Sequence, residues 1–214
     1  PQSVWDLLHK PNSAPEGMAY DPQTNLWWDI YLVSWDGSEM VSSYNATTAD
    51  GASSPSFHWY NFTELLASGK RLPMNMEFGR ASRGSPQETN ISGSSDPGST
   101  GGHSDTNGRR IISDIGCEDM TGVLRQWGGD GGATNDIGSS WSDADTDGTS
   151  GSYDNQEGVG RGQHYEAPNR LLFGGYWGNG AKAGSRFVNG SWSPVYLGSD
   201  VGARGVAEPA PAKR

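Results

Sequence analysis

Short apolar runs alternate with turn-forming residues over the first 91 residues of the chain, which is typical of a folded domain. Residues 27–33 form an aromatic and β-branched run, and the pair Asp36-Gly37 follows it. Such a run predicts a β-strand, and an Asp-Gly pair is typical of the turn that ends one. We therefore expect a strand over 27–33 that ends in a turn.

Two short helices are predicted further along this part of the chain. In the segment 61–69, three apolar side chains recur at the spacing of one helical face. Asn61 is the expected N-cap of this helix, and Gly69 its end. A second helix is expected over 76–81, with Asn75 as its N-cap.

The character of the sequence changes at residue 92. Gly, Ser, Asp, Asn and Thr dominate residues 92–162, where only the segments 111–112 and 123–127 have the composition of a core. Because aromatic residues are spaced through this zone, we expect long ordered surface loops rather than a disordered linker. Residues 163–206 regain aromatic content between glycines, which predicts brief strands and tight turns. The whole of 1–206 is interpreted as a single domain, and 207–214 as a tail.

Composition excludes several classes of protein. The net charge of −10 argues against a nucleic-acid partner, because phosphate binding needs clustered Lys and Arg. The chain has no apolar run long enough to span a bilayer, so membrane insertion is not expected. Cys117 is the sole cysteine, which excludes an internal disulfide framework, and it is expected to be a small buried residue. An acidic, Gly- and Trp-rich chain of this kind fits an extracellular or virion-borne domain.

One acidic stretch has the spacing of a calcium loop. Asp143, Asp145 and Asp147 alternate before Gly148, and Asp154 falls where an EF-hand places its twelfth-position carboxylate. The flanks are rich in Gly and Ser and predict no entering or exiting helix. Calcium is therefore the one cofactor that the sequence suggests, with a solvated acidic loop as the alternative; no cofactor is required.

Several motifs resemble those of a known family. The segment 69–73 (Gly-Lys-Arg-Leu-Pro), which lies between the first predicted helix and Met76-Glu77-Phe78, is similar to the signature of a C-type lectin-type fold. This version of the fold is shared by formylglycine-generating enzymes and by variable proteins of diversity-generating retroelements. The C-terminal part resembles the variable region of the phage major tropism determinants. The segments that carry this resemblance are Leu172-Phe173-Gly174-Gly175, Trp177, Gly184-Ser185-Arg186, Pro194 and Gly202-Ala203-Arg204-Gly205-Val206.

The resemblance implies both a fold and a function. It implies an α+β, C-type lectin-like fold with short helices, a small antiparallel sheet and long Gly/Asp-rich loops. It also implies a receptor-binding protein at the tip of a viral tail fibre, present in several copies as a homo-oligomer on the virion. The implied partner is a host cell-surface protein or another macromolecular ligand. In such proteins an error-prone reverse transcriptase rewrites adenines in one gene segment and so diversifies the binding surface.

The candidate binding residues lie in the variable region, 172–206, between the matching positions. They are Tyr176, Gly178, Asn179, Lys182, Phe187, Asn189, Gly190, Ser191, Trp192, Tyr196, Gly198 and Asp200. Several alternate with framework positions, and alternation in an extended segment sends one set of side chains to one face. Large aromatic residues mixed with Gly, Ser and Asn are typical of a paratope. The alternative is that Phe187, Trp192 and Tyr196 are ordinary core residues. The resemblance assigns the framework role to Trp177, Arg186, Pro194 and Arg204.

Two other functions are the alternatives. A calcium-dependent carbohydrate-binding lectin of this fold would carry Glu-Pro-Asn or Gln-Pro-Asp with Trp-Asn-Asp, and none of these tripeptides occurs. An oxidase similar to formylglycine-generating enzymes needs two cysteines near the C-terminus to bind copper, and Cys117 alone cannot supply them. The sequence also lacks a Gly-x-Ser-x-Gly elbow and a His-Glu-x-x-His pattern. A receptor-binding protein that is not an enzyme is therefore the leading hypothesis.

Overall fold

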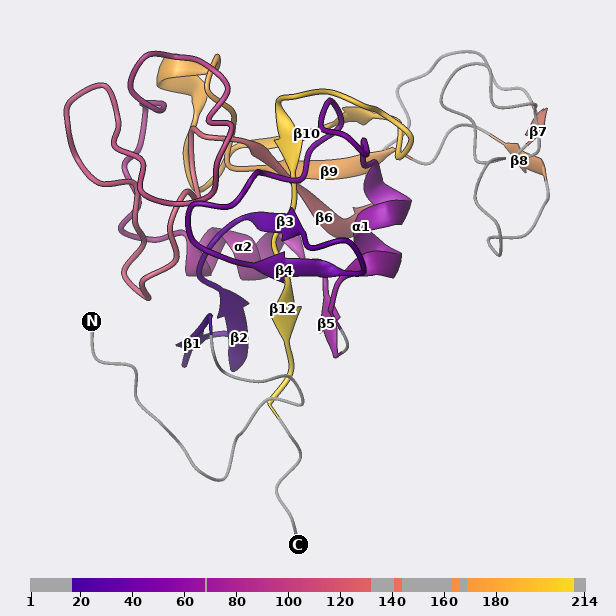
Figure 1. Cartoon of the computed structure of the whole chain (residues 1–214), viewed down its shortest axis with the longest axis horizontal. Helices are drawn as coiled ribbons and strands as arrows, with labels where there is room; N and C mark the ends of the chain where they lie inside the picture. Colours follow the sequence, from indigo (N-terminus) through magenta and orange to yellow (C-terminus); the bar gives the residue numbers. More distant parts are fainter. Residues whose placement is uncertain (1–16, 68, 132–140, 144–162, 166–168, 210–214) are drawn as a thin grey trace, which may run out of the picture.

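The computed structural model describes residues 17–67, 69–131, 141–143, 163–165 and 169–209, and the strands of this part form two small sheets and two strand pairs (Figure 1). The β2 sheet has the order β1-β2-β12-β5 and is antiparallel. The β6 sheet has the order β10-β9-β6-β11, with β11 parallel to β6 and the other pairs antiparallel. The remaining pairs are β3-β4 and β7-β8.

The elements are short. The strands are β1 Met18–Asp21, β2 Leu26–Asp29, β3 Val33–Trp35, β4 Met40–Ser42, β5 Lys70–Arg71, β6 Arg125–Gly131, β7 Trp141–Asp143, β8 Gln163–Tyr165, β9 Arg170–Phe173, β10 Val188–Trp192, β11 Val201–Gly202 and β12 Val206–Ala207. The helices are α1 Trp59–Leu65, α2 Asn75–Ala81 and the 3₁₀ turn Gly180–Lys182. In the described part, no helix is long and apolar enough to cross a bilayer.

The strand predicted over 27–33 is two strands. β2 ends at Asp29, and β3 begins at Val33 and pairs with β4. Between them, the backbone N–H of Ile30 donates to the Gly17 carbonyl and that of Tyr31 to the Ser42 hydroxyl. The chain thus leaves the β2 sheet and enters a hairpin, which apolar character alone could not indicate.

Both predicted helices exist, but both begin earlier than expected. α1 starts at Trp59, and the Asn61 side chain accepts a hydrogen bond from the His58 backbone N–H at 3.0 Å. α2 starts at Asn75, and Glu77 accepts from the Met74 backbone N–H at 2.8 Å. Asn61 is therefore the third residue of a capping box rather than the N-cap. The predicted N-cap of α1 was wrong because a capping box places its most visible polar residue inside the first turn. In α2, Asn75 is the first helical residue and Met74 is the N-cap. The expected end of the first helix at Gly69 was also wrong, since α1 ends at Leu65.

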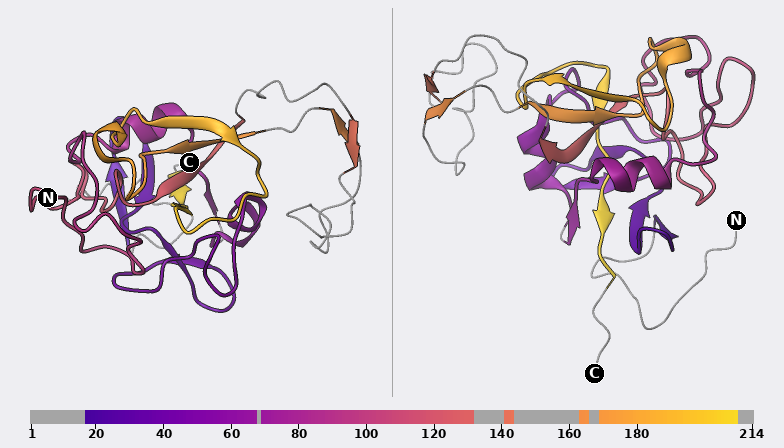
Figure 2. Two further views of the ribbon diagram at one scale, coloured as in Figure 1. Left: turned by 90° about the horizontal axis from the view of Figure 1, so that it is seen from above. Right: turned by 180° about the vertical axis from the view of Figure 1, so that it is seen from behind.

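The β6 sheet separates two parts of the core. Neighbouring residues of β6 and β9 point to opposite faces, so Trp127 and Leu172 pack with Phe62 of α1. Phe173 faces the other way and lies against Phe78 of α2, with ring centroids 5.2 Å apart. Figure 2 shows α2 beneath β9 and β10 when the molecule is seen from behind. The sheet therefore carries two distinct faces, one toward α1 and one toward α2.

The Gly/Asp-rich zone is not loop throughout, because β6 lies inside 92–162 and forms the centre of a sheet. Up to residue 124 this zone is irregular, with isolated bridges such as Ile112↔Glu118. Polar side chains connect these loops. The Asp119 carboxylate accepts a hydrogen bond from the Gly101 backbone N–H and forms another with the His103 ring, both at 2.8 Å. Within the described portion, these loops are thus joined to one another by side-chain hydrogen bonds.

A buried arginine joins the two sheets. Arg204 has no exposed surface and donates to the backbone carbonyls of Asp29 and Glu118 and to the Gln126 side chain. The Asp29 carboxylate in turn pairs with Lys70 at 2.7 Å and accepts from the Gly205 backbone N–H. Buried polar groups are stable only when they are hydrogen-bonded, and every donor group of Arg204 has a partner. This network fixes the end of the variable region.

Candidate functional site

Four of the predicted binding residues gather at the face of the β6 sheet toward α1. Arg125 precedes Trp127 by two residues and so shares its face. The Arg125 guanidinium lies 4.7 Å from the centroid of the Tyr176 ring and 5.3 Å from that of Trp192. Tyr196 stacks on Trp192, with centroids 4.0 Å apart and an interplanar angle of 33°. One cation thus lies against two aromatic rings from separate segments, and a third ring stacks on one of them.

An ion pair holds this cation in place. Arg125 pairs with Asp200, and the Tyr196 hydroxyl donates to the same carboxylate at 3.1 Å. Arg125 and Asp200 are both buried, whereas the three rings are half-buried. We call these five residues, Arg125, Tyr176, Trp192, Tyr196 and Asp200, the Arg125 cluster. Its rings reach the surface, and its charges lie beneath them.

Burial and charge act in opposite directions on Arg125. Removal from water lowers the pKa of its guanidinium, while the neighbouring Tyr196 and Tyr176 oppose this. An arginine remains protonated even so, because its unperturbed pKa lies far above neutrality. The cluster therefore keeps a fixed positive charge under its aromatic surface, which favours cation–π attraction.

A second pair of this kind lies nearby. The Arg170 guanidinium is 4.1 Å from the centroid of the Trp59 ring, and the Trp59 indole N–H donates to the Gly128 carbonyl at 2.7 Å. The Trp59 backbone N–H donates to the carbonyl of Pro194. Helix α1 is thereby joined to the turn that carries Tyr196, which restricts the position of the cluster.

Sequence reasoning missed Arg125, Trp59 and Arg170. Arg125 stands in the segment 123–127, which was expected to enter the core, and a charged residue inside such a segment must find a partner. That was the available signal, but it does not identify Asp200 or the rings. For Trp59 and Arg170 the sequence offers no comparable signal.

The structure brings together Tyr176, Trp192, Tyr196 and Asp200 from the predicted set. They do not meet by alternation along an extended strand, because β10 ends at Trp192 and residues 193–200 are turns and irregular structure. That expected geometry was wrong, although the grouping of Tyr196 with Asp200 follows the prediction. Asp200 is buried beneath the rings, so its direct action is on Arg125 and Tyr196 rather than at the surface.

The small predicted residues support the rings. A Cβ atom at Gly178 would lie 2.8 Å from the Tyr176 ring, and one at Gly198 would lie 2.5 Å from the Tyr196 hydroxyl. The Asn179 side chain accepts from the Tyr176 backbone N–H at 2.9 Å. Because Gly178 and Gly198 have no side chains, the rings of Tyr176 and Tyr196 can lie close to the backbone of the neighbouring residues.

The other predicted residues lie outside the Arg125 cluster. The Asn189 side chain accepts from both the backbone N–H and the hydroxyl of Ser191, within β10, where Gly190 separates the two. Lys182 is exposed and Phe187 half-buried. In the described structure, no hydrogen bond, ion pair or ring contact joins either of them to the cluster.

The framework residues behave differently from one another. Trp177 donates through its backbone N–H to the Val123 carbonyl, and its own carbonyl accepts from the Asn90 side chain. Pro194 and Arg204 are buried. Arg186 is exposed and lines a groove on the other face of the sheet. Three of the four thus hold backbone in place, as a framework role requires.

The calcium prediction falls largely outside the described residues. The backbone of Asp143 lies in β7, while Asp145, Asp147 and Asp154 are not described. Among the described residues, no group of three or more His, Cys, Asp or Glu side chains is arranged to hold a metal ion. Calcium binding stays a prediction.

Cys117 is buried, as expected. It has no exposed surface, and burial raises the pKa of its thiol to about 12. A thiol of this kind is protonated near neutral pH, whereas a copper ligand or nucleophile must be a thiolate. The confirmed burial therefore gives Cys117 a structural role in the core.

Solved structures similar to this chain identify its fold. The Major Tropism Determinant M1 variant superposes with a TM-score of 0.76 at 30% identity and covers 99% of this chain and 57% of that chain. The U1 variant gives a TM-score of 0.74 at 31% identity and covers 97% of this chain and 56% of that chain. The chain therefore has the C-type lectin-like, α+β fold that the sequence resemblance implied, and this expectation is confirmed.

A curated protein is similar over nearly the same extent. The tail fiber receptor-binding protein of Bordetella phage BPP-1 is 33% identical over 227 residues, which is 96% of this chain and 55% of the relative. No protein-family model matches the chain. The chain thus spans a little over half the length of the relatives it matches, which are named for receptor binding and tropism rather than for an enzymatic activity.

Proposed function

We propose that this chain is a receptor-binding domain of a viral tail fibre and that the surface over the Arg125 cluster contacts the ligand. One observation carries the proposal: half-buried aromatic residues from the predicted variable region gather over one fixed cation, in a fold similar to that of tail-fibre receptor-binding proteins. Receptor binding is the named role of those relatives, and the aromatic surface gives this chain a means to perform it.

The ligand we propose is a host cell-surface protein or another macromolecule. Tyr and Trp contribute a large contact area at low entropic cost, and they dominate the binding energy of many protein interfaces. The exposed Gly178 and Ser191 near the rings leave room for a partner to approach. A homo-oligomer on the virion would add avidity through effective concentration, which compensates for a shallow single site.

Diversification by a retroelement is the finer part of the proposal. Its support is the separation of roles within 172–206. Trp177 and Arg204 are held through backbone carbonyls, whereas Tyr176, Trp192 and Tyr196 contact one another's side chains or Arg125. Sequencing the gene's neighbourhood for a template repeat and a reverse transcriptase tests it. Differences between repeat and gene confined to adenines would support it, and a lone gene without either element would contradict it.

The experiment for the binding site compares variants on candidate host cells. Tyr176→Ser and Tyr196→Ser, made together, remove both half-buried tyrosine rings of the cluster and leave the buried residues Arg125 and Asp200 in place. The matched control is Tyr44→Ser, because Tyr44 is 59% exposed and lies outside the variable region. We expect the double variant to lose cell binding and the control to keep it.

Two outcomes would contradict this assignment. Equal binding by parent and double variant would move the site away from the Arg125 cluster. The second outcome is that the double variant still binds cells and that a calcium chelator abolishes binding by the parent. This result would place the site at the acidic stretch that contains Asp143 and would favour a calcium-dependent lectin. Each variant's melting curve must match the parent's for the comparison to count.

A further inference from the structure

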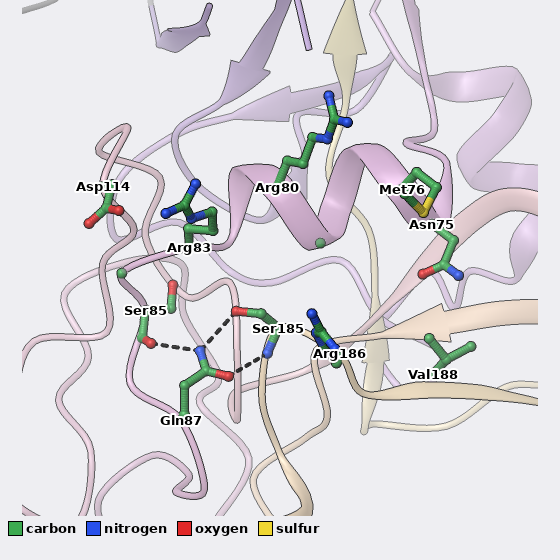
Figure 3. A pocket seen from close by; sticks show the side chains of 12 residues that line it. Asn75, Met76, Arg80, Arg83, Ser85, Gln87, Asp114, Ser185, Arg186 and Val188 are labelled. Carbon is green, nitrogen blue, oxygen red and sulfur yellow. Dashed lines mark hydrogen bonds between the residues drawn. The ribbon is translucent and has the colours of Figure 1, made fainter. Parts of the chain in front are cut away.

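A groove lies on the face of the β6 sheet toward α2, on the other side of the sheet from the Arg125 cluster (Figure 3). Its volume is about 920 Å³. One wall is α2 with the residues that follow it, and the other is the segment 185–188 that leads into β10. Val188 pairs with Phe173 and therefore shares the face that packs against α2.

The groove is basic although the chain is acidic. Arg80, Arg83 and Arg186 line it, against one carboxylate, that of Asp114. Arg83 and Arg186 are exposed, and neither forms an ion pair or hydrogen bond through its side chain within the described structure. Arg80 reaches the Gln23 carbonyl at 3.4 Å. In a chain of net charge −10, two unpaired guanidinium groups in one groove form a local attraction for an anion.

Hydrogen bonds from one side chain also join the two walls of the groove. The Gln87 side chain donates to the Ser85 carbonyl at 2.7 Å and to the Ser185 hydroxyl at 2.8 Å. It also accepts from the Ser185 backbone N–H at 2.8 Å. These bonds, drawn as dashed lines in Figure 3, tie the two walls together. The backbone next to Arg186 is thereby held in place, although the Arg186 side chain itself is exposed.

The lining indicates the class of ligand. Met76 is 71% exposed and Val188 is 43% exposed, and both lie at one end of the groove, away from Arg83 (Figure 3). No aromatic ring lines the groove among the described residues, so a sugar ring would find no stacking partner there. Guanidinium groups match carboxylates in geometry, and Met adapts to varied apolar side chains. β10 is also an edge strand, which an extended peptide can follow.

We propose that this groove binds an acidic peptide segment of a protein partner, with its carboxylates at Arg83 and Arg186 and an apolar side chain against Met76 and Val188. The contact is separate from the Arg125 cluster and holds whether or not that cluster binds a receptor. Because the attraction is largely electrostatic, it weakens as salt rises.

The test measures binding of labelled peptides to the full chain by fluorescence anisotropy at low salt. The probe is a peptide of four glutamates followed by two leucines, and a second probe replaces the glutamates with lysines. We expect the acidic probe to bind and the basic probe not to. Arg186→Glu should weaken binding of the acidic probe about tenfold, since it removes a charge-assisted contact and adds repulsion.

The matched control is Lys182→Glu, which makes the same charge change at an exposed residue outside the groove. With both variants measured at about 0.15 M salt, where the Debye length is about 8 Å, we expect it to change the affinity by less than about twofold, because it removes no contact in the groove. Equal losses in both variants would overturn the proposal, because they would indicate a general effect of net charge. Both residues are exposed, so matching melting curves are expected and confirm that each variant is folded.

Two further arms fix the ligand class. Met76→Ser should weaken binding of the probe with leucines but leave a hexaglutamate probe unchanged, if the apolar end acts as proposed. A sulfated oligosaccharide that binds more tightly than the acidic peptide, with the same loss in Arg186→Glu, would overturn the peptide in favour of an anionic sugar.

Discussion

Arg204 and Arg125 are both buried, but the structures around them differ in kind. Arg204 donates mainly to backbone carbonyls, those of Asp29 and Glu118, deep between the two sheets. Arg125 contacts side chains, the rings of Tyr176 and Trp192 and the carboxylate of Asp200, close to the surface. Backbone acceptors persist whatever residue carries them, whereas side-chain partners change with the sequence. Arg204 therefore belongs to a framework that tolerates substitutions nearby, whereas substitutions around Arg125 can remodel the site.

The largest effect is expected at Arg204. Arg204→Met would leave two buried carbonyls and the Gln126 side chain without their donors, so we expect a loss of about 4 kcal/mol in the free energy of unfolding. Urea denaturation followed by tryptophan fluorescence measures it. The control is Arg83→Met, at an exposed arginine without an ion pair, which should change stability by less than about 0.5 kcal/mol. A loss at Arg204 as small as the control's would mean that these carbonyls find other partners.

A smaller effect is expected at Arg125, and it should be reversible. Arg125→Met leaves the Asp200 carboxylate buried without a cation, at a cost of about 2 kcal/mol, because the half-buried rings admit some water. Adding Asp200→Asn removes that charge and should restore at least half of the loss. Such rescue is not available at Arg204, whose main partners are carbonyls.

The same urea experiment measures the double variant. If Asp200→Asn deepens the loss rather than reversing it, the ion pair is not what stabilises the cluster, and the contrast with Arg204 fails. A cell-binding assay on the same proteins then shows whether the rings need Arg125 beneath them.

The framework was more accessible from the sequence than the site. Ordered motifs such as 69–73 implied the fold, and apolar spacing located the two helices even where their first residues were misplaced. The cluster depends on contacts between Arg125 in β6 and residues of turns and strands far along the chain. No periodicity in the sequence encodes such a contact. Alternation grouped Tyr196 with Asp200, but their meeting depends on a turn.

A third arginine, Arg71, differs from both because one of its partners is a partly exposed carboxylate that can be protonated. It donates to the Glu77 carboxylate at 2.7 and 2.8 Å and also to Glu208. Burial alone would raise the pKa of Glu77, but the hydrogen bonds from Arg71 and from the Met74 backbone N–H hold it below its ordinary value. Unlike the carbonyl partners of Arg204, this partner can be lost by protonation.

The smallest effect is therefore expected for Glu77→Gln, about 1 kcal/mol at neutral pH, because the pair is partly exposed and screened. A pKa lower in the folded than in the unfolded state stabilises the fold above the unfolded value, and this contribution is lost as pH falls through the folded value. The difference between parent and variant should thus be full at pH 7 and shrink from about pH 5 to about pH 3. Glu64→Gln, at an exposed glutamate of α1, is the control and should show no such difference. A difference in the free energy of unfolding that stays constant down to about pH 3 would contradict this prediction, because it would not depend on the charge of Glu77. Arg71 would then resemble Arg204, whose partners do not titrate.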